Sequence, residues 1–291
     1  MTELAAAPAI HIALTFDDNF WAPAYAVMRS ACLFTHRRRD LVFHLFHRPL
    51  APQHHADLQA ITAEFGAKVV FYDLDNFALF ADIAARMPKK KRLPNIVYAR
   101  LLIDRLLPPD VARVIYLDCD VLVRDGIEAL YDIDLKGFPI AAVRDTQGAL
   151  IVGGRDLKHN RDLFDIADPY FNSGVIVIDV ALWRAAGIAE RLEQALTEGT
   201  MSRIYFDQDF LNLMFKNNWL ALPTRWNTID ARHAHEGTNP AILHYTGNFK
   251  PWHLISNGAF RRIYRHVMTN ELFYRFMRHR WRRYWLAKLG R

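Results

Sequence analysis

Short apolar runs alternate with amphipathic segments along most of the chain. Six runs rich in β-branched and aliphatic residues predict strands, at residues 10–16, 41–46, 68–72, 114–117, 140–143 and 174–178. Between the first three runs, apolar residues recur with helical spacing at residues 24–34 and 54–65, and Pro52 and Gly66 mark the ends of the second segment. This order predicts an α/β fold with a mostly parallel sheet and helices on both of its faces.

The ends of the predicted strands indicate where a ligand binds. In a mostly parallel sheet, ligands bind at the edge formed by the carboxyl ends of the strands. Asp17 follows the first predicted strand and Asp118 follows the fourth, so we expect both residues at this edge. The chain contains neither a Gly-x-Gly-x-x-Gly motif nor a Walker loop, which argues against a dehydrogenase or a P-loop nucleotidase.

One pair of aspartates is placed where two carboxylates are costly. The chain contains four Asp-x-Asp triplets, Asp73/Asp75, Asp118/Asp120, Asp132/Asp134 and Asp207/Asp209. Only Asp118/Asp120 has a hydrophobic strand pattern on both sides, at residues 114–117 and 121–123. Two ionised carboxylates in such a place repel each other and are poorly solvated, and a divalent cation neutralises both. The pair therefore predicts a metal site that handles a phosphorylated substrate.

Composition and cysteine usage narrow the class of protein. With 291 residues, 52% of them hydrophobic, the chain can form one large or two small domains with a full core. Cys32 and Cys119 are its only cysteines, too few for a disulfide framework and outside any zinc-type spacing. Neither a signal peptide nor a membrane span is expected, because charges interrupt the longer apolar stretches. These features predict a cytoplasmic protein.

The positive charge is concentrated at the C-terminus. Residues 260–291 contain ten Lys or Arg and one Glu, so they carry +9 while the rest of the chain carries −3. The same segment is rich in rings, with Phe260, Tyr264, Phe273, Tyr274, Phe276, Trp281, Tyr284 and Trp285. This composition suits the headgroup region of an anionic bilayer. A helix packed on the core through its rings is the alternative, and nucleic-acid binding is disfavoured because the remaining chain is net acidic.

Six segments of the sequence resemble one known family in the order that the family has them. They are residues 14–19 (LTFDDN), 98–101 (YARL), 114–126 (VIYLDCDVLVRDG), 170–175 (YFNSGV), 206–212 (FDQDFLN) and 244–253 (HYTGNFKPWH). They resemble glycosyltransferase family 8, most closely the bacterial lipopolysaccharide galactosyltransferases and glucosyltransferases, with glycogenin as a more distant relative. The resemblance implies a GT-A nucleotide-binding domain, which we expect at residues 1–257. The composition of the C-terminal segment predicts a basic, aromatic helical tail at residues 258–291.

The resemblance also implies a set of metal and donor contacts. Asp118, Asp120 and His244 resemble the ligands of Mn²⁺, with Mg²⁺ as the alternative, and oxygen with imidazole ligation suits Mn²⁺. In the family this ion bridges the diphosphate of UDP-galactose or UDP-glucose, and Lys250 and Gly247 match the segment that covers it. The implied donor-binding residues are Thr15, Asp17, Asn19, Phe20, Arg100, Asp118, Cys119, Asp145, Asn172, Gly247 and Lys250.

Several of these residues also have ordinary structural interpretations. Asp17 and Asn19 suit a turn after a strand, Asp207 suits a helix N-cap, and Arg100 could pair with Asp104 along a helix. In the family interpretation, Asp207 and Gln208 are instead the catalytic positions, and Phe20 stacks on the base. Gln208 is an amide and a poor nucleophile, so it favours front-face transfer in which UDP itself accepts the proton of the acceptor.

The expected function is therefore retaining transfer of a hexose from a UDP-sugar to a saccharide acceptor. The tail favours an acceptor in the lipopolysaccharide core or another lipid-linked glycan, reached from the inner face of the bacterial cytoplasmic membrane. A soluble glucosyltransferase of the glycogenin type is the alternative within enzymes. A sugar-nucleotide-binding protein without turnover is the alternative outside them.

Overall fold

The strands form two sheets that differ in size. The computed structural model describes residues 8–88, 95–145, 162–165, 167–204, 206–247, 250–253 and 256–289. In this part of the chain, a seven-stranded sheet has the order β3-β2-β1-β4-β7-β6-β8 and a three-stranded sheet has the order β5-β10-β9. The strands are β1 (Ile10–Phe16), β2 (Leu41–His47), β3 (Lys68–Asp73), β4 (Arg113–Leu117), β5 (Val121–Val123), β6 (Ile140–Arg144), β7 (Phe171–Asp179), β8 (Leu220–Leu222), β9 (Thr228–Ile229) and β10 (Ile242–His244).

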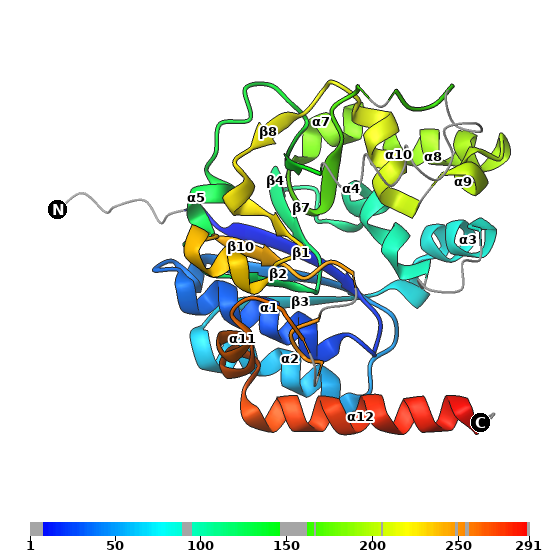
Figure 1. Cartoon of the computed structure of the whole chain (residues 1–291). Helices are drawn as coiled ribbons and strands as arrows, with labels where there is room; N and C mark the ends of the chain where they lie inside the picture. Colours follow the sequence, from blue (N-terminus) through cyan, green and yellow to red (C-terminus); the bar gives the residue numbers. More distant parts are fainter. Residues whose placement is uncertain are drawn as a thin grey trace.

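Helices cover both faces of the large sheet (Figure 1). The α-helices are α1 (Trp21–Phe34), α2 (Pro52–Phe65), α3 (Ala78–Arg86), α4 (Ile103–Leu106), α5 (Glu128–Tyr131), α7 (Val180–Ala185), α8 (Ile188–Thr197), α9 (Thr200–Arg203), α10 (Phe206–Phe215), α11 (Arg261–Met268) and α12 (Asn270–Lys288). The 3-10 helices are η1 (Arg38–Asp40), η2 (Leu74–Asn76), η3 (Asn95–Leu102), η4 (Thr224–Trp226) and η5 (His233–Thr238). The predicted α/β fold with helices on both faces is confirmed.

The direction of the strands brings two predicted site segments together. β3, β2, β1 and β4 run parallel, so the carboxyl ends of β1 and β4 lie at the same edge. This agrees with the expected proximity of Asp17 and Asp118. β7 runs antiparallel to both of its neighbours, β4 and β6, which makes the sheet mixed rather than wholly parallel.

Two hydrophobic cores lie on opposite faces of the sheet, because successive side chains of a strand point to opposite faces. Ile12 and Leu14 of β1 pack with α1, α2, α11 and α12, whereas Ala13 between them belongs to the core under η3, α3, α7, α8 and α10. Figure 1 shows these two groups of helices on the two sides of the sheet. All three side chains are fully buried.

The two helices predicted from sequence begin earlier than expected. The segment predicted at 24–34 forms α1 from Trp21, with Pro23 in the first turn, where its missing N–H costs no helical hydrogen bond. The segment predicted at 54–65 forms α2 from Pro52, and Gly66 ends it in the left-handed conformation with φ 72°. The turn residues therefore marked the second helix correctly, to within two residues.

The basic C-terminal segment is half core and half surface. Tyr264 of α11 and Phe276 of α12 are buried, and the Phe276 ring lies 5.3 Å from that of Trp21 and 6.0 Å from that of Trp252. His279 and Arg280 still contact the body, through Trp21 and His253, whereas residues 281–289 of the same segment are exposed, and the C-terminal end of α12 projects from the body (Figure 1). No helix within the described ranges is both long and apolar enough to cross a membrane.

Candidate metal and donor-sugar site

An irregular strand pair shapes the centre of the site. The register between β6 and β7 shifts between Ala142 and Arg144, so β7 bulges in the stretch that contains Asn172 and Gly174. On the opposite side of β7, the backbone N–H of Asp118 donates to the Gly174 carbonyl at 2.8 Å. The end of β4 is therefore fixed directly against this bulge.

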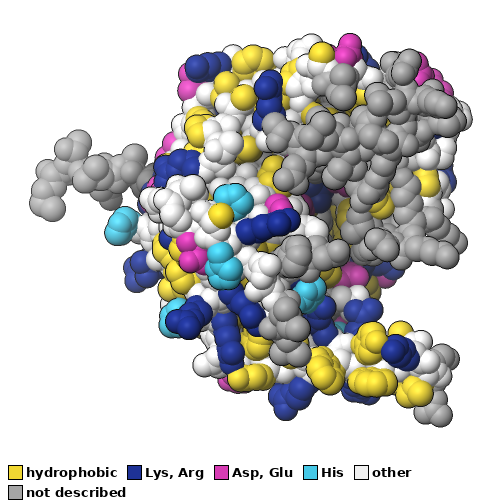
Figure 2. All heavy atoms as spheres, in the orientation of Figure 1, with side chains coloured by type: hydrophobic (Ala, Val, Ile, Leu, Met, Phe, Trp, Pro, Cys, Tyr) yellow, Lys and Arg dark blue, Asp and Glu magenta, His cyan; other side chains and the backbone are white. Residues whose placement is uncertain are grey.

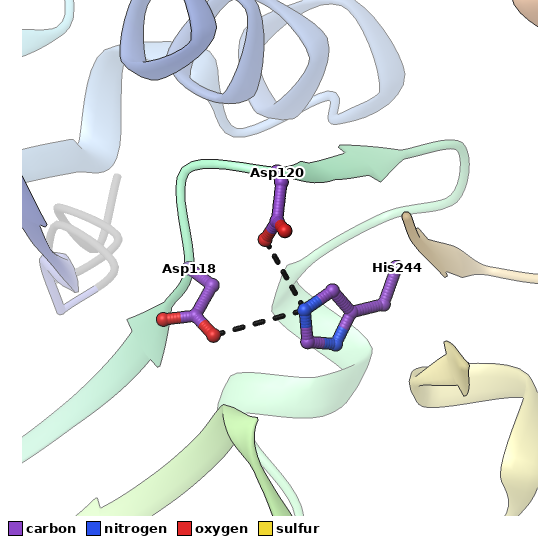
Figure 3. A group of neighbouring side chains, drawn as sticks. All are labelled: Asp118, Asp120 and His244. Atoms are coloured by element: carbon purple, nitrogen blue, oxygen red, sulfur yellow. Dashed lines mark ion pairs between the residues drawn. The ribbon is translucent and has the colours of Figure 1, made fainter. Parts of the chain in front are cut away.

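The small sheet brings His244 to the two aspartates. β10 pairs antiparallel with β5, and this register places His244 opposite Val121, the residue after Asp120. Figure 3 shows the three side chains pointing toward one another, with His244 Nε2 at 3.1 Å from Asp120 Oδ1 and 3.7 Å from Asp118 Oδ2. Among the described residues, this is the one group of at least three His, Cys, Asp or Glu side chains close enough to share a metal ion.

The donor set fits a divalent cation. Adjacent ligands of a six-coordinate ion with bonds of about 2.1 Å lie roughly 3 Å apart. The separations around His244 Nε2, 3.1 and 3.7 Å, are close to this value. Burial raises the pKa of the Asp120 carboxyl, but Lys250 and His244 outweigh burial and hold that pKa well below its usual range. Asp120 is therefore a carboxylate that is ready to bind a cation.

Gly174 leaves space for this group. A Cβ at this position would lie 2.1 Å from His244 Cε1 and 2.7 Å from Asp118 Oδ2, both far inside van der Waals contact. A residue with a side chain would displace the imidazole or the carboxylate. Glycine at this point of β7 is therefore required by the site rather than by the backbone conformation.

Arg100 joins two of the predicted carboxylates. It lies in η3 and is buried, with its Nη2 2.6 Å from Asp118 Oδ1 and its Nε 2.7 Å from Asp207 Oδ2. Burial lowers its pKa, and the two carboxylates raise it by more. The alternative pairing of Arg100 with Asp104 is wrong, because Asp104 instead pairs with Arg105 at 3.2 Å. Arg100 is thus part of the site.

The residues predicted to bind the donor sugar form one hydrogen-bonded group. Asn172 Nδ2 donates to Asp145 Oδ2 at 3.1 Å and to Gln208 Oε1 at 3.2 Å. Gln208 Nε2 in turn donates to Asp145 Oδ2 at 3.3 Å. Asp207 and Gln208 lie in the first turn of α10, which begins at Phe206, so Asp207 is not the residue that precedes the helix. Carboxylate and amide groups held in this way suit the recognition of sugar hydroxyls.

The residues predicted at the nucleotide lie at the ends of β1 and β4. Thr15 Oγ1 is 2.8 Å from the Tyr116 hydroxyl, which donates to Asp118 Oδ1, and Cys119 Sγ donates to the Thr15 carbonyl at 3.6 Å. Burial raises the pKa of the Cys119 thiol, so this thiol stays protonated.

Asp17 and Asn19 bind each other in a turn. Asp17 accepts hydrogen bonds from the backbone and side-chain nitrogens of Asn19, at 2.9 and 3.0 Å. The turn interpretation of this pair is therefore correct, and base recognition by it stays a prediction. Phe20 is half-exposed, and its ring meets Trp252 edge-on at 6.1 Å.

The segment after β10 reaches back to the metal site. Gly247 adopts φ 68°, a conformation that favours glycine. Lys250 Nζ lies 2.5 Å from Asp120 Oδ2 and donates to the Tyr245 carbonyl at 2.5 Å. Asp120 therefore faces His244 with one oxygen and Lys250 with the other.

Sequence reasoning missed three contributors to the site. Tyr116 lies two residues before Asp118 on the same side of β4, so strand periodicity could have found it. Ser173 lies inside the recognised 170–175 segment, and its carbonyl and hydroxyl both accept from Arg100. Asn227 is buried, with its Oδ1 3.0 Å from His244 Nδ1, and nothing in the local sequence pattern marks it.

Comparisons with known proteins agree with this geometry. The profile of Glycosyl transferase family 8 matches residues 11–256. General stress protein A of Bacillus subtilis is 27% identical over 278 residues, which cover 89% of this chain and 93% of that protein. Lipopolysaccharide 1,2-glucosyltransferase of Escherichia coli is 26% identical over 266 residues, covering 85% of this chain and 76% of that protein.

A solved structure confirms the predicted GT-A architecture. The crystal structure of the galactosyltransferase LgtC in complex with donor and acceptor sugar analogues superposes with a TM-score of 0.74 and 25% sequence identity. The match covers 89% of this chain and 95% of that chain.

Proposed function

Because this chain belongs to glycosyl transferase family 8, we propose that it moves a hexose, galactose or glucose, from a UDP-sugar to a saccharide acceptor with retention of configuration. The observation that carries the proposal is the convergence of Asp118, Asp120 and His244 at the edge of the sheet. Two carboxylates and an imidazole suit Mn²⁺, with Mg²⁺ as the weaker alternative. The similarity to a lipopolysaccharide 1,2-glucosyltransferase and to the galactosyltransferase LgtC supports the choice of sugars.

The residues around the metal ligands have distinct roles in this proposal. A bound ion supplies Lewis-acid stabilisation of the departing diphosphate. Lys250 adds a second positive charge at the same carboxylate, 2.5 Å from Asp120, and can turn onto a phosphate oxygen. Asp145, Asn172 and Gln208 hold the sugar hydroxyls and fix the orientation of the ring. An amide at position 208 favours front-face transfer over a covalent glycosyl-enzyme, which needs a carboxylate nucleophile.

A panel of nucleotide sugars tests the proposed donor. We expect Mn²⁺-dependent release of UDP from UDP-galactose or UDP-glucose, with water replacing the acceptor, and no release from ADP- or GDP-sugars. A chelator should stop the reaction, because two carboxylates and a histidine hold the diphosphate only through the ion. Release at the same rate without metal, or no turnover of either UDP-sugar, would contradict the proposal and favour the binding-protein alternative. Core oligosaccharide compared with soluble glycans as acceptor separates the lipopolysaccharide-type enzyme from the glycogenin type.

We also propose that the outer half of α12 holds the enzyme on the inner face of the cytoplasmic membrane. Trp281, Tyr284 and Trp285 are each more than half exposed, with values of 52–55%. Figure 2 shows hydrophobic side chains, in yellow, beside Lys and Arg side chains, in dark blue, on the projecting end of the helix at the lower right. Exposed rings beside basic side chains suit the interface of an anionic bilayer. In this proposal, residues 258–291 form a separate unit for membrane attachment. Its first part, α11 and the start of α12, packs on the core.

Removal of residues 281–291 is expected to weaken binding to vesicles that contain phosphatidylglycerol by at least about tenfold. This truncation removes three exposed rings and four basic residues, but it keeps Phe276 in the core. The measurement is vesicle co-sedimentation, with neutral phosphatidylcholine vesicles as the control lipid. Release of UDP in solution should stay close to that of the full chain. Equal affinity of the two proteins for anionic vesicles would refute the membrane proposal.

A further inference from the structure

Asn227 lies between the candidate metal ligands and the donor-sugar residues. Only 1% of its surface is exposed, its Oδ1 is 3.0 Å from His244 Nδ1, and its Nδ2 donates to Asn172 Oδ1 at 2.8 Å. We propose that Asn227 is a positioning residue that fixes the tautomer of His244 and connects the metal site to the sugar-binding residues. This inference rests on the metal of the proposed function.

The backbone determines which way the amides of this group point. Asn172 Oδ1 accepts a hydrogen bond from the Gly174 N–H at 3.0 Å, and Gln208 Oε1 accepts one from the Ser173 N–H at 3.1 Å. A backbone N–H only donates, so the side-chain atoms that face these groups are oxygens. Asn172 Oδ1 therefore faces Asn227 as an acceptor. Asn227 must present its NH₂ group to Asn172 and its oxygen to the histidine.

This orientation fixes the proton on the imidazole. Because Asn227 Oδ1 can only accept, His244 Nδ1 carries the hydrogen and donates it. His244 Nε2 then has its lone pair available toward Asp118 and Asp120. Histidines that bind metals usually donate their other ring N–H to an oxygen acceptor, which orients the ring and increases its basicity. The amide of Asn227 occupies this position.

The local fold holds Asn227 in place from both sides. Its backbone N–H donates to the Thr224 carbonyl at 3.1 Å, which closes the turn of η4. β9 begins at the next residue and pairs with β10, with Ile229 opposite His244. The side chain is therefore fixed relative to the imidazole by a turn and by a strand pair. A small movement of His244 on metal binding is expected to reach Asn172, and through it Asp145 and Gln208.

Two substitutions separate the two hydrogen bonds of Asn227. Asn227→Ala removes both of them. Asn227→Asp keeps an acceptor for His244 Nδ1, but its carboxylate cannot donate to Asn172 Oδ1, so two acceptors then face each other. Thr35→Ala is the matched control, because Thr35 is buried and directly follows the last residue of α1. Its hydroxyl donates to Glu128 Oε2 and accepts from the Arg37 N–H. The control loses buried hydrogen bonds without touching the site.

The first measurement is Mn²⁺ affinity of the nucleotide-free full chain, from the electron paramagnetic resonance signal of free Mn²⁺. Asn227→Ala is expected to lower this affinity by about 10- to 100-fold. Asn227→Asp should keep at least the wild-type affinity and instead lower kcat for donor hydrolysis, because the sugar-binding residues lose their connection. Thr35→Ala should melt earlier and bind Mn²⁺ as the wild type does.

The second measurement is the nitrogen-15 spectrum of the histidine rings in the Mg²⁺-loaded protein, with His244 assigned by comparison with His244→Gln. The inference expects the proton of His244 on Nδ1 in the wild type and in Asn227→Asp. A proton on Nε2, or wild-type Mn²⁺ affinity in Asn227→Ala, would overturn it. If Asn227→Ala does not fold, unchanged kcat and KM in Asn227→Asp would overturn the connection to the sugar site. Failure of the wild type to use any UDP-sugar would reject the proposed function. The Mn²⁺ affinities and the nitrogen-15 spectrum would still test this inference, because neither measurement needs a UDP-sugar.

Discussion

Asp120→Asn is expected to lower the rate of Mn²⁺-dependent UDP release by about 10³-fold or more, with the protein still folded. The two oxygens of Asp120 face different groups, since Oδ1 lies 3.1 Å from His244 Nε2 and Oδ2 lies 2.5 Å from Lys250 Nζ. An amide has the same shape but no charge, and its NH₂ group must point at the imidazole or at the ammonium. Either orientation removes a metal ligand or an acceptor for Lys250.

Asp134→Asn is the matched control for this experiment. Asp134 belongs to another Asp-x-Asp triplet of the chain, but it is exposed and its carboxylate accepts from the Lys136 N–H. Its substitution should leave UDP release and Mn²⁺ affinity unchanged. Both variants are compared by UDP release with increasing Mn²⁺, and by Mn²⁺ affinity in the absence of nucleotide. Full turnover by Asp120→Asn at moderate Mn²⁺ would show that the three side chains do not hold the catalytic ion.

The sequence predicted the strands that are buried on both faces better than the small sheet. β1, β2 and β4 are rich in apolar residues, and their predicted bounds agree with the structure to within one residue. β9 has two residues and β10 has three, too few for a periodic pattern to be recognised. β7 begins at Phe171, three residues before its predicted start, because polar Asn172 and Ser173 continue the strand into the site.

In the candidate site, the residues marked by a local sequence pattern could be predicted, whereas those that depend on contacts between distant segments could not. Asp118 and Asp120 could be selected from four similar triplets because hydrophobic strands flank them. His244 is more than a hundred residues away, and without the family resemblance only the pairing of β10 with β5 identifies it. Asn227 has no such motif, since its contribution depends on a buried contact between two amides.

The C-terminal segment shows what composition does not reveal. Its rings and basic residues suit both a membrane surface and a packed helix, and the structure shows one part of the segment buried and another exposed. Phe276 packs against Trp21 and Trp252, while Trp281 and Trp285 are exposed further along the same helix. Composition is an average over the segment, so it could not separate the buried half of α12 from the exposed half.

Arg100→Met is expected to cause the largest loss of stability, about 3–5 kcal/mol, which corresponds to a fall in melting temperature on the order of 10 °C. The guanidinium lies 2.6 Å from Asp118 and 2.7 Å from Asp207, and the arginine and Asp207 are both buried. Methionine fills a similar volume but leaves two carboxylates without their shared counter-charge. Arg86→Met is the matched control, because Arg86 also joins two carboxylates, Asp82 and Glu193, but on the surface. Its melting temperature should change little, since water and salt screen exposed pairs.

The pH dependence of Arg100→Met identifies the group responsible for this loss. Burial raises the pKa of the Asp207 carboxyl even beside Arg100, and removal of the arginine raises this pKa further. A carboxyl whose pKa is higher in the folded protein binds its proton more tightly there, so stability falls as pH rises through that pKa and recovers below it. The difference in unfolding free energy between Arg100→Met and the wild type should therefore shrink as pH falls through the raised pKa of Asp207 in the variant. Arg100→Met combined with Asp207→Asn should recover part of the loss at the higher pH. A loss that is independent of pH and unchanged in the double variant would mean that Arg100 stabilises the fold through packing on Tyr116, whose ring lies 4.4 Å away, rather than through its charge.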